Sequence, residues 1–177
     1  MSLHVPASVS SDGTRRVVWI PGGALDPENV TPEELSAPTS LDVSMYLVHG
    51  ADGFNGTVPQ DTIQDPRQGS SQLFTKPGRK NPTLSIRYVF NDAEPTDNEA
   101  KLELVEGASG AFVQLFQVPE DYDPETDGDY AGFTYRYWPV QLGEQDVMPE
   151  EANLPDRINQ GTFISGPVRY GTVVGGS

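Results

Sequence analysis

The sequence predicts a mainly β protein: an antiparallel β-sandwich with one flanking α-helix and a long inter-strand loop. Several short segments alternate apolar and polar residues, as half-buried strands do, whereas one segment has the period of an amphipathic helix. The chain of 177 residues is long enough for one domain and short for two. We therefore expect a single domain over residues 1–177, with an N-terminal arm at 1–13 and the long loop at 49–82.

The strand predictions follow from this alternation. In Leu41–Val48 every second residue is apolar, and Thr83–Phe90 repeats the pattern. Ala111–Val118 is apolar on nearly both sides, so we expect it at the centre of a sheet. The remaining expected strands are 14–20 and 133–142, followed by a strand pair or a bent strand over 157–174. The acidic stretches 119–132 and 143–155 are expected to be loops.

Two capping boxes predict helix starts. Thr31-Pro32-Glu33-Glu34 combines a Thr cap, a Pro at the first helical position and a Glu that can close the box. Pro38 limits that helix to one or two turns. Thr96–Glu99 begins the stronger candidate, a helix of about ten residues that ends near Gly107. Such a short helix must pack against a sheet to be stable.

Charge narrows the possible functions. The chain carries 26 acidic and 11 basic residues, a formal net charge of −15, so it should not bind nucleic acid by neutralising phosphates. The charges are unevenly placed: Arg67–Phe90 contains five basic residues and no acid, and Asn91–Asp129 contains twelve acids and one base. The asymmetry is consistent with solubility alone, or with a basic patch on one copy that meets an acidic patch on the next.

Motifs for catalysis are absent. The chain has no cysteine, and its two histidines, His4 and His49, have no sequence neighbours that could form a relay. We expect no catalytic, cofactor or metal residues, and a soluble protein made in a cytosol, without a signal peptide or a membrane span. The alternative is a calcium- or carbohydrate-binding sandwich module that uses Asp121–Asp129 with Tyr135 and Trp138. Asp121–Asp129 lacks the Glu and the flanking helices of a calcium-binding hand.

The connection His49–Pro82 joins two predicted strands and is several times longer than the usual two to five residues. It is rich in Gly, Pro, Asn and Asp, which favour turns, yet it also carries Phe54, Ile63 and Phe74. A compact domain rarely keeps such a loop unless it binds something or is disordered. We therefore predict a binding role.

Taken in their order along the chain, several segments resemble the major tail tube protein of long-tailed, siphovirus-type bacteriophages, particularly those that infect actinobacteria. The resemblance covers nearly the whole chain and rests on the order and spacing of structural motifs. These motifs are WIPGGALDPENVTPEELSAPTSLDVSMYL (19–47), PTLSIRYVFND (82–92), DNEAKLELVEGASGAFVQLF (97–116), YWPVQLGEQ (137–145) and RINQGTFISGPV (157–168).

This resemblance implies a structural virion protein of the tail, whose copies form stacked hexameric rings through which DNA passes at ejection without specific binding. Its partners would be its own copies, a tape-measure protein and the tail tip and terminator proteins, with no membrane. The alternatives are a tail terminator, a connector or a decoration protein. The expected inter-subunit residues are Phe54, Val58, Ile63, Arg67, Phe74, Lys76, Arg79 and Lys80. The expected lumen-facing residues are Asp42, Ser44, Ser85 and Arg87.

Overall fold

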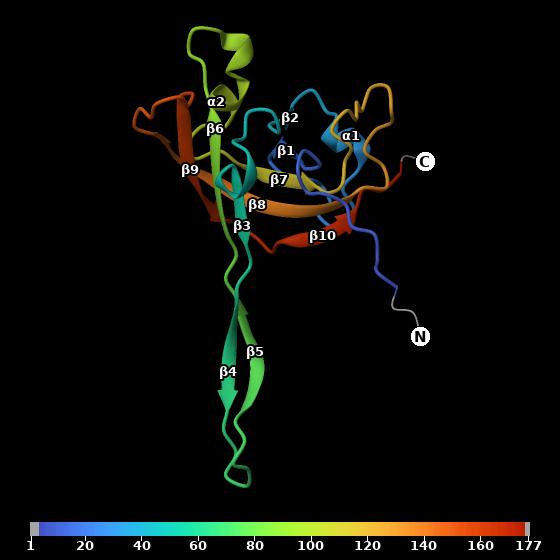
Figure 1. Cartoon of the computed structure of the whole chain (residues 1–177), viewed down its shortest axis with the longest axis vertical. Coiled ribbons are helices and arrows are strands. Elements are labelled where there is room, and N and C mark those ends of the chain that lie inside the picture. The colour runs from blue at the N-terminus through green and yellow to red at the C-terminus, as the bar shows by residue number, and fades with distance from the viewer. Residues whose placement is uncertain (1–3, 176–177) are drawn as a thin grey trace.

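The structure is a computed structural model that describes residues 4–175. It is mainly β and antiparallel, which confirms the predicted fold class. Its strands are β1 (Arg16–Pro21), β2 (Leu41–Asp42), β3 (Phe54–Thr57), β4 (Gln60–Asp65), β5 (Phe74–Lys80), β6 (Thr83–Val89), β7 (Ser109–Leu115), β8 (Thr134–Val147), β9 (Arg157–Ile164) and β10 (Arg169–Thr172). Its helices are α1 (Pro32–Leu35) and α2 (Glu99–Glu103), with 3-10 turns at η1 (Gly50–Asp52) and η2 (Pro95–Asp97). A body holds most elements, and β4 and β5 project from it (Figure 1).

The main sheet has the strand order β2-β1-β7-β8-β9-β6-β3, with β10 also paired to β8. The sheet folds over itself and brings β3, at one end of the strand order, against β7, near the other end. Phe54 of β3 packs edge-on against Phe112 of β7, with ring centroids 5.8 Å apart. Phe54 also lies 6.3 Å from Trp138 of β8, and a Cβ on Gly56 would overlap that indole. β8 contributes to both halves and shifts register between Leu142 and Gln145, where the sheet is irregular.

Two hydrophobic clusters lie on opposite faces of β1, β7 and β8. The cluster between the two halves of the sheet includes Trp19, Phe112 and Trp138. The second cluster lies beneath α1 and the 119–133 segment and includes Val113 and Tyr135. β7 therefore buries both faces and pairs with β1 and β8, which confirms its predicted central position.

The prediction of one strand over Leu41–Val48 was wrong. Only β2 pairs with β1, and the chain then turns until Leu47 bridges Tyr88 on β6. The Val48 N–H donates to the Arg87 carbonyl at 3.0 Å, and Met45, expected on the apolar face, is 85% exposed. This segment is a strap that connects the two ends of the strand order. Its apolar residues contact the core at separate points rather than along one strand face.

The helix predictions had mixed outcomes. The capping box at Thr31 is confirmed, because the Glu34 N–H donates to Thr31 Oγ1 and the Thr31 N–H donates to Glu34 Oε2 at 3.0 Å. The capping box at Thr96 was wrong: η2 covers Thr96, and α2 is only five residues long. Asn98 precedes α2 but does not cap it. Its side-chain N–H donates to Asp92 Oδ1, and its side-chain oxygen accepts from the Asn91 N–H. Among residues 4–175, none of the helices is long and apolar enough to span a membrane.

The C-terminal part of the chain resolves the alternative left open by the sequence. β9 and β10 both run antiparallel along β8, so 157–174 is one bent strand interrupted near Gly166. β8 continues to Val147, and the loop predicted over 143–155 therefore begins later than expected. The acidic segment 119–132 forms no strand or helix, as predicted.

A buried polar network fastens α2 to the sheet and leads to a pH prediction. The Tyr88 hydroxyl donates to Gln160 Oε1 at 3.1 Å, and the Gln160 and Gln145 amides donate to the Leu104 carbonyl at 2.9 and 2.8 Å. Burial raises the pKa of Tyr88 from 10.0 to about 12, and burial raises the pKa of Tyr130 to about 12 as well.

The folded state therefore holds both phenol protons more tightly than the unfolded state does. Their stabilising effect is complete below pH about 10 and is lost as the pH rises toward about 12. We expect the free energy of unfolding, measured by urea titration, to fall between pH 9.5 and 11.5 by on the order of 2 kcal/mol per tyrosine. Tyr130→Phe should show a shallower fall than the wild type. An equal slope in both proteins would contradict this assignment.

Candidate assembly surfaces

The segment 49–82 is mostly a β-hairpin rather than the irregular loop that its composition suggested. β3 pairs with β6 up to Thr57 and Thr83, and β4 then pairs with β5 as a separate two-stranded sheet. We call residues 58–82 the arm. It projects from the body as one long element (Figure 1). Pro77 and Gly78 are tolerated inside β5 because each arm strand has an unpaired edge.

The arm has no hydrophobic core of its own. No residue of β4 or β5 is buried, and Ile63 and Phe74 are 54% and 45% exposed. At about 3.3 Å per residue, the ten residues from Pro59 to Gln68 reach roughly 30 Å. An isolated two-stranded hairpin is at best marginally stable in water. An arm of this length and exposure is therefore suited to docking on another surface.

The predicted inter-subunit residues fall into two groups. Phe54 and Val58 are partly buried and pack against the first cluster at the base of the arm. The other six lie along the arm and are mostly exposed: Ile63, Arg67, Phe74, Lys76, Arg79 and Lys80. Sequence analysis missed Asp65, whose carboxylate forms ion pairs of 2.9 Å with both Arg67 and Lys76.

The predicted lumen-facing residues lie in two places. Ser85 and Arg87 are on β6, opposite the buried residues of that strand. Asp42 and Ser44 lie in the strap, where the Ser44 hydroxyl bonds Asp42 and accepts from the Val17 N–H at 2.8 Å.

The register around β6 reveals a polar sheet face. Ser85 is paired with Asn55 and Gly161, and Arg87 is paired with Asn159, so these residues share one side of the sheet. Asp146 of β8 faces Asn159 across the next pair, and Phe163 continues the same side of β9. The alternation of β6 could identify its own outward residues, but the neighbours depend on cross-strand register, which the sequence does not show.

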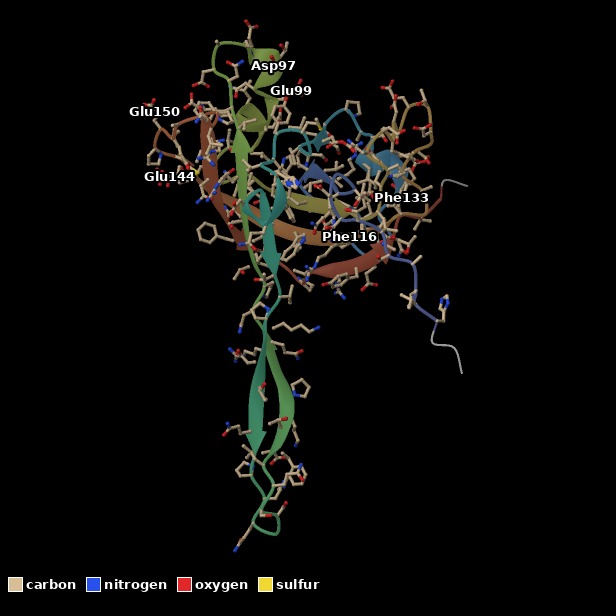
Figure 2. The ribbon with its side chains drawn as sticks, in the orientation of Figure 1. Asp97, Glu99, Phe116, Phe133, Glu144 and Glu150 are labelled. Atoms are coloured by element: carbon tan, nitrogen blue, oxygen red, sulfur yellow. The ribbon has the colours of Figure 1, made fainter. Side chains whose placement is uncertain are left out.

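The charges are separated along the molecule. The arm carries four basic and two acidic residues, whereas the other 152 residues, which we call the body, carry seven basic and 24 acidic residues. Asp97 and Glu99 lie at the end opposite the arm, and Glu144 and Glu150 lie on one side of the body (Figure 2). Copies placed in a row along this axis would bring unlike charges together.

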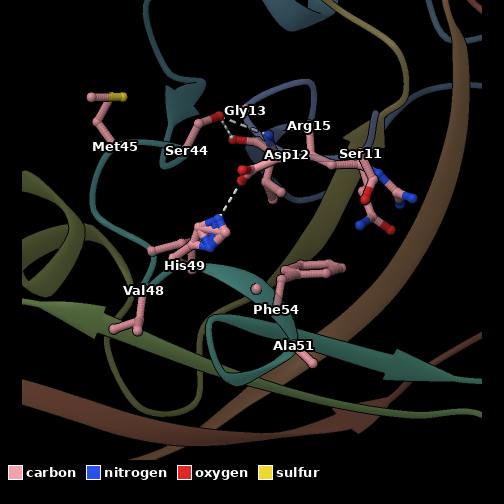
Figure 3. Close-up of a pocket in the computed structure, with 14 residues that line it drawn as sticks. Ser11, Asp12, Gly13, Arg15, Ser44, Met45, Val48, His49, Ala51 and Phe54 are labelled. Atoms are coloured by element: carbon pink, nitrogen blue, oxygen red, sulfur yellow. Dashed lines mark hydrogen bonds and ion pairs between the residues drawn. The ribbon is translucent and has the colours of Figure 1, made fainter. Parts of the chain in front are cut away.

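A groove of about 690 Å³ lies between the N-terminal segment and the strap. Figure 3 shows Asp12 and His49 on its two sides, joined by a 2.5 Å bond between Asp12 Oδ1 and His49 Nε2. Both side chains are about three-quarters exposed. The pair links residues 11–13 to His49, directly after the strap, a contact that their separation in the sequence hid. Residues 4–13 are exposed and form no strand or helix. Residues 1–3, the rest of the expected N-terminal extension, lie outside the described residues.

The binding-module alternative receives no support from the geometry. Trp138 and Tyr135 are buried on opposite faces of the sheet and cannot stack on a sugar from solvent. Within residues 4–175, no three acidic or histidine side chains gather as a metal site. In the 121–129 loop, the Asp123 and Asp127 carboxylates accept backbone N–H groups of the same loop.

A search among solved structures finds a chain of the "Cryo-EM structure of the anti-feeding prophage (AFP) baseplate, 6-fold symmetrised" with a TM-score of 0.52 and 14% identity. The match covers 97% of this chain and 99% of that chain, so the two share a fold. No curated protein matches the sequence. The profile of the family described as phage tail tube protein matches residues 3–177. The chain therefore belongs to the phage tail tube protein family, whose members are structural components of the virion tail and not enzymes.

Proposed function

We propose that this protein forms hexameric rings that stack into the tail tube of a siphovirus-type, actinobacteriophage-like phage, and that the tube conducts DNA at ejection. Family membership supports a structural tail protein. The observation that carries the stacking step is the arm, which leaves the body and exposes Ile63 and Phe74. A structural relative comes from a baseplate described as six-fold symmetrised, which is consistent with a ring of six.

Closure of the ring would cover unpaired strand edges. β2 and β3 end the strand order of the main sheet, and each has one edge without a paired strand. Exposed edges template unwanted pairing, and a closed barrel removes them. In this proposal, neighbouring subunits in a ring cover these edges. Each contact joins two unlike surfaces of the same chain, as a head-to-tail ring requires.

For the channel surface, we propose the polar face of β3, β6 and β9. Ser85 and Arg87 lie there, with Asn55 and Asn159 beside them. Hydroxyl and amide groups with few charges would let DNA or a tape-measure protein pass without a fixed binding register. The tail tip and terminator proteins would meet the two ends of the tube.

Electron microscopy of the purified protein, before and after prolonged concentration, tests the proposal. We expect rings and then tubes of constant diameter, because every copy carries both the arm and the acidic body. Protein that remains monomeric at high concentration would contradict self-assembly. Rings that never stack would indicate a connector or terminator instead of the tube subunit.

A further inference from the structure

The connection between β8 and β9, residues 148–156, protrudes from one side of the body (Figure 1). We call it the β8–β9 loop. All of its residues except the first are exposed, and Leu154 is 47% exposed. A turn fixes its shape, because the Leu154 N–H donates to the Glu151 carbonyl at 3.2 Å and Asn153 has a left-handed φ of 65°. The loop therefore presents an apolar side chain in a defined position on the surface.

The β8–β9 loop and the end of β8 that leads into it are strongly acidic. Residues 143–156 contain five acids and no base. Glu151 is paired with Arg157 of β9 at 2.6 Å. The other four acids form no ion pair within the described residues: Glu144, Asp146, Glu150 and Asp156. Leu154 is thus surrounded in the sequence by unbalanced negative charge.

The groove between the N-terminal segment and the strap has the complementary character. Its lining includes the apolar side chains of Val17 and Phe54. Asp12 is the one acid among its described lining residues, and its carboxylate is bonded to His49. Arg15 also lines the groove, is exposed, and forms no ion pair within the described part of the chain. The groove therefore offers apolar contact together with an unpaired cation.

A second unpaired arginine lies beside the groove. Gln114 lines the groove and is paired with Arg136 of β8, so their side chains share one side of the sheet. The Arg136 guanidinium stacks on the Tyr170 ring at 4.8 Å. In the same way, the Arg15 guanidinium stacks on the Phe116 ring at 4.6 Å. Stacking orders a guanidinium while its edge N–H groups can still donate to a carboxylate. Arginines with aromatic neighbours are also typical of protein–protein interfaces.

The loop and the groove lie on different sides of the body. Figure 2 shows Glu144 and Glu150 on one side and Phe116, the ring that holds Arg15, on the other. The loop of one copy can therefore meet the groove of another copy but not its own groove. Each such contact joins two unlike surfaces of the same chain, and contacts of this kind close into a ring when the rotation between copies allows it.

We infer that the β8–β9 loop of one copy inserts Leu154 into the groove of its neighbour in the same ring, with Glu150 facing Arg15. This inference rests on the proposed assembly into rings. Leu154 supplies the apolar centre of the contact, and the carboxylates around it face the two stacked arginines at its margin.

Two single charge reversals test the contact, Arg15→Glu in the groove and Glu150→Arg in the loop. Each variant alone brings like charges together at every contact. An equal mixture of the two can form a ring with an even number of alternating subunits. In that ring the reversed groove receives the reversed loop and the native groove receives the native loop, so every contact joins unlike charges again. Glu125→Arg makes the same change of charge in the 119–132 segment and is the control.

A fourth variant, Leu154→Gln, removes the apolar centre without a change of charge. All four positions are exposed, so each variant should melt within about 2 °C of the wild type as a monomer. Sedimentation velocity and electron microscopy at low salt, where charges are least screened, give the protein concentration at which half of the copies are in rings or tubes.

We expect each single reversal, and Leu154→Gln, to raise that concentration at least about tenfold. The mixture and Glu125→Arg should stay within about twofold of the wild type. A mixture that does not recover, or reversals that assemble as the wild type does, would overturn the inference while leaving the proposed function intact. Wild-type protein that forms no rings or tubes would overturn the proposed function itself. The two failures are therefore distinguishable.

Discussion

Replacing residues 58–82 with Asn-Gly should yield a protein that folds normally and forms no tubes. Thr57 and Thr83 are a cross-strand pair at the base of the arm, so a two-residue turn can join β3 directly to β6. The removed residues contribute little to the core, because Val58 alone among them packs against it and is only partly buried, and no residue of β4 or β5 is buried. We expect a melting temperature within about 5 °C of the wild type.

Circular dichroism would measure the folding of the truncated protein, and electron microscopy would measure its assembly. A deletion that starts at Gly53 is not an equivalent test, since it removes β3 and with it the packing of Phe54 on Phe112. A mixing experiment provides the control: the truncated protein retains the acidic body, so it should add to the end of a wild-type tube from which arms project and stop further growth there. Tubes made of truncated protein alone would show that the arm is not the stacking element.

Trp138→Ala should produce the largest loss of stability, about 3–5 kcal/mol. Trp138 is completely buried where the two halves of the sheet meet, and Phe54 and Gly56 lie against its indole. Truncation to Ala leaves a cavity between two rigid sheet layers, which cannot collapse to fill it. Because domains of this kind are stable by roughly 5–15 kcal/mol, the variant should be close to unfolding.

Phe163→Ala is the matched control for this substitution. Phe163 is an aromatic residue on β9 but lies on the outer face and is 68% exposed. We expect its loss to change the free energy of unfolding by less than about 0.5 kcal/mol in urea titrations of the monomer. Similar losses for the two variants would mean that the two halves of the sheet do not close on Trp138.

The sequence predicted the strands whose alternation reflects burial on one side. β6 follows its pattern residue by residue, with Leu84, Ile86 and Tyr88 buried. The same pattern misled at 41–48, where Val43 and Leu47 contact the core but Met45 is exposed and the off-pattern Tyr46 packs inward. Alternation is therefore not sufficient evidence for a strand, because strand pairing depends on partners far along the chain.

The arm could be located from the sequence but its structure could not. Every side of β4 and β5 is open to solvent, so no apolar periodicity marks these strands. Composition therefore identified Ile63, Phe74 and the basic residues without showing which of them share a face. That information depends on the register of β4 against β5, which shifts between Gln60 and Thr62.

The pairing of β1 with β7 has a consequence for synthesis of the chain. Val18 is paired with Val113, so β1 leaves the ribosome about 95 residues before its partner. At roughly 5–20 residues per second, β1 waits on the order of 5–20 s with its edge and its apolar residues unprotected. Residues 1–90 carry nine acidic and seven basic residues, so charge repulsion between nascent chains is weak for most of that interval. Residues 91–177 carry the remaining 17 acidic and four basic residues, so the surplus of carboxylates appears only as β7 itself is about to be made and cannot protect β1 before then.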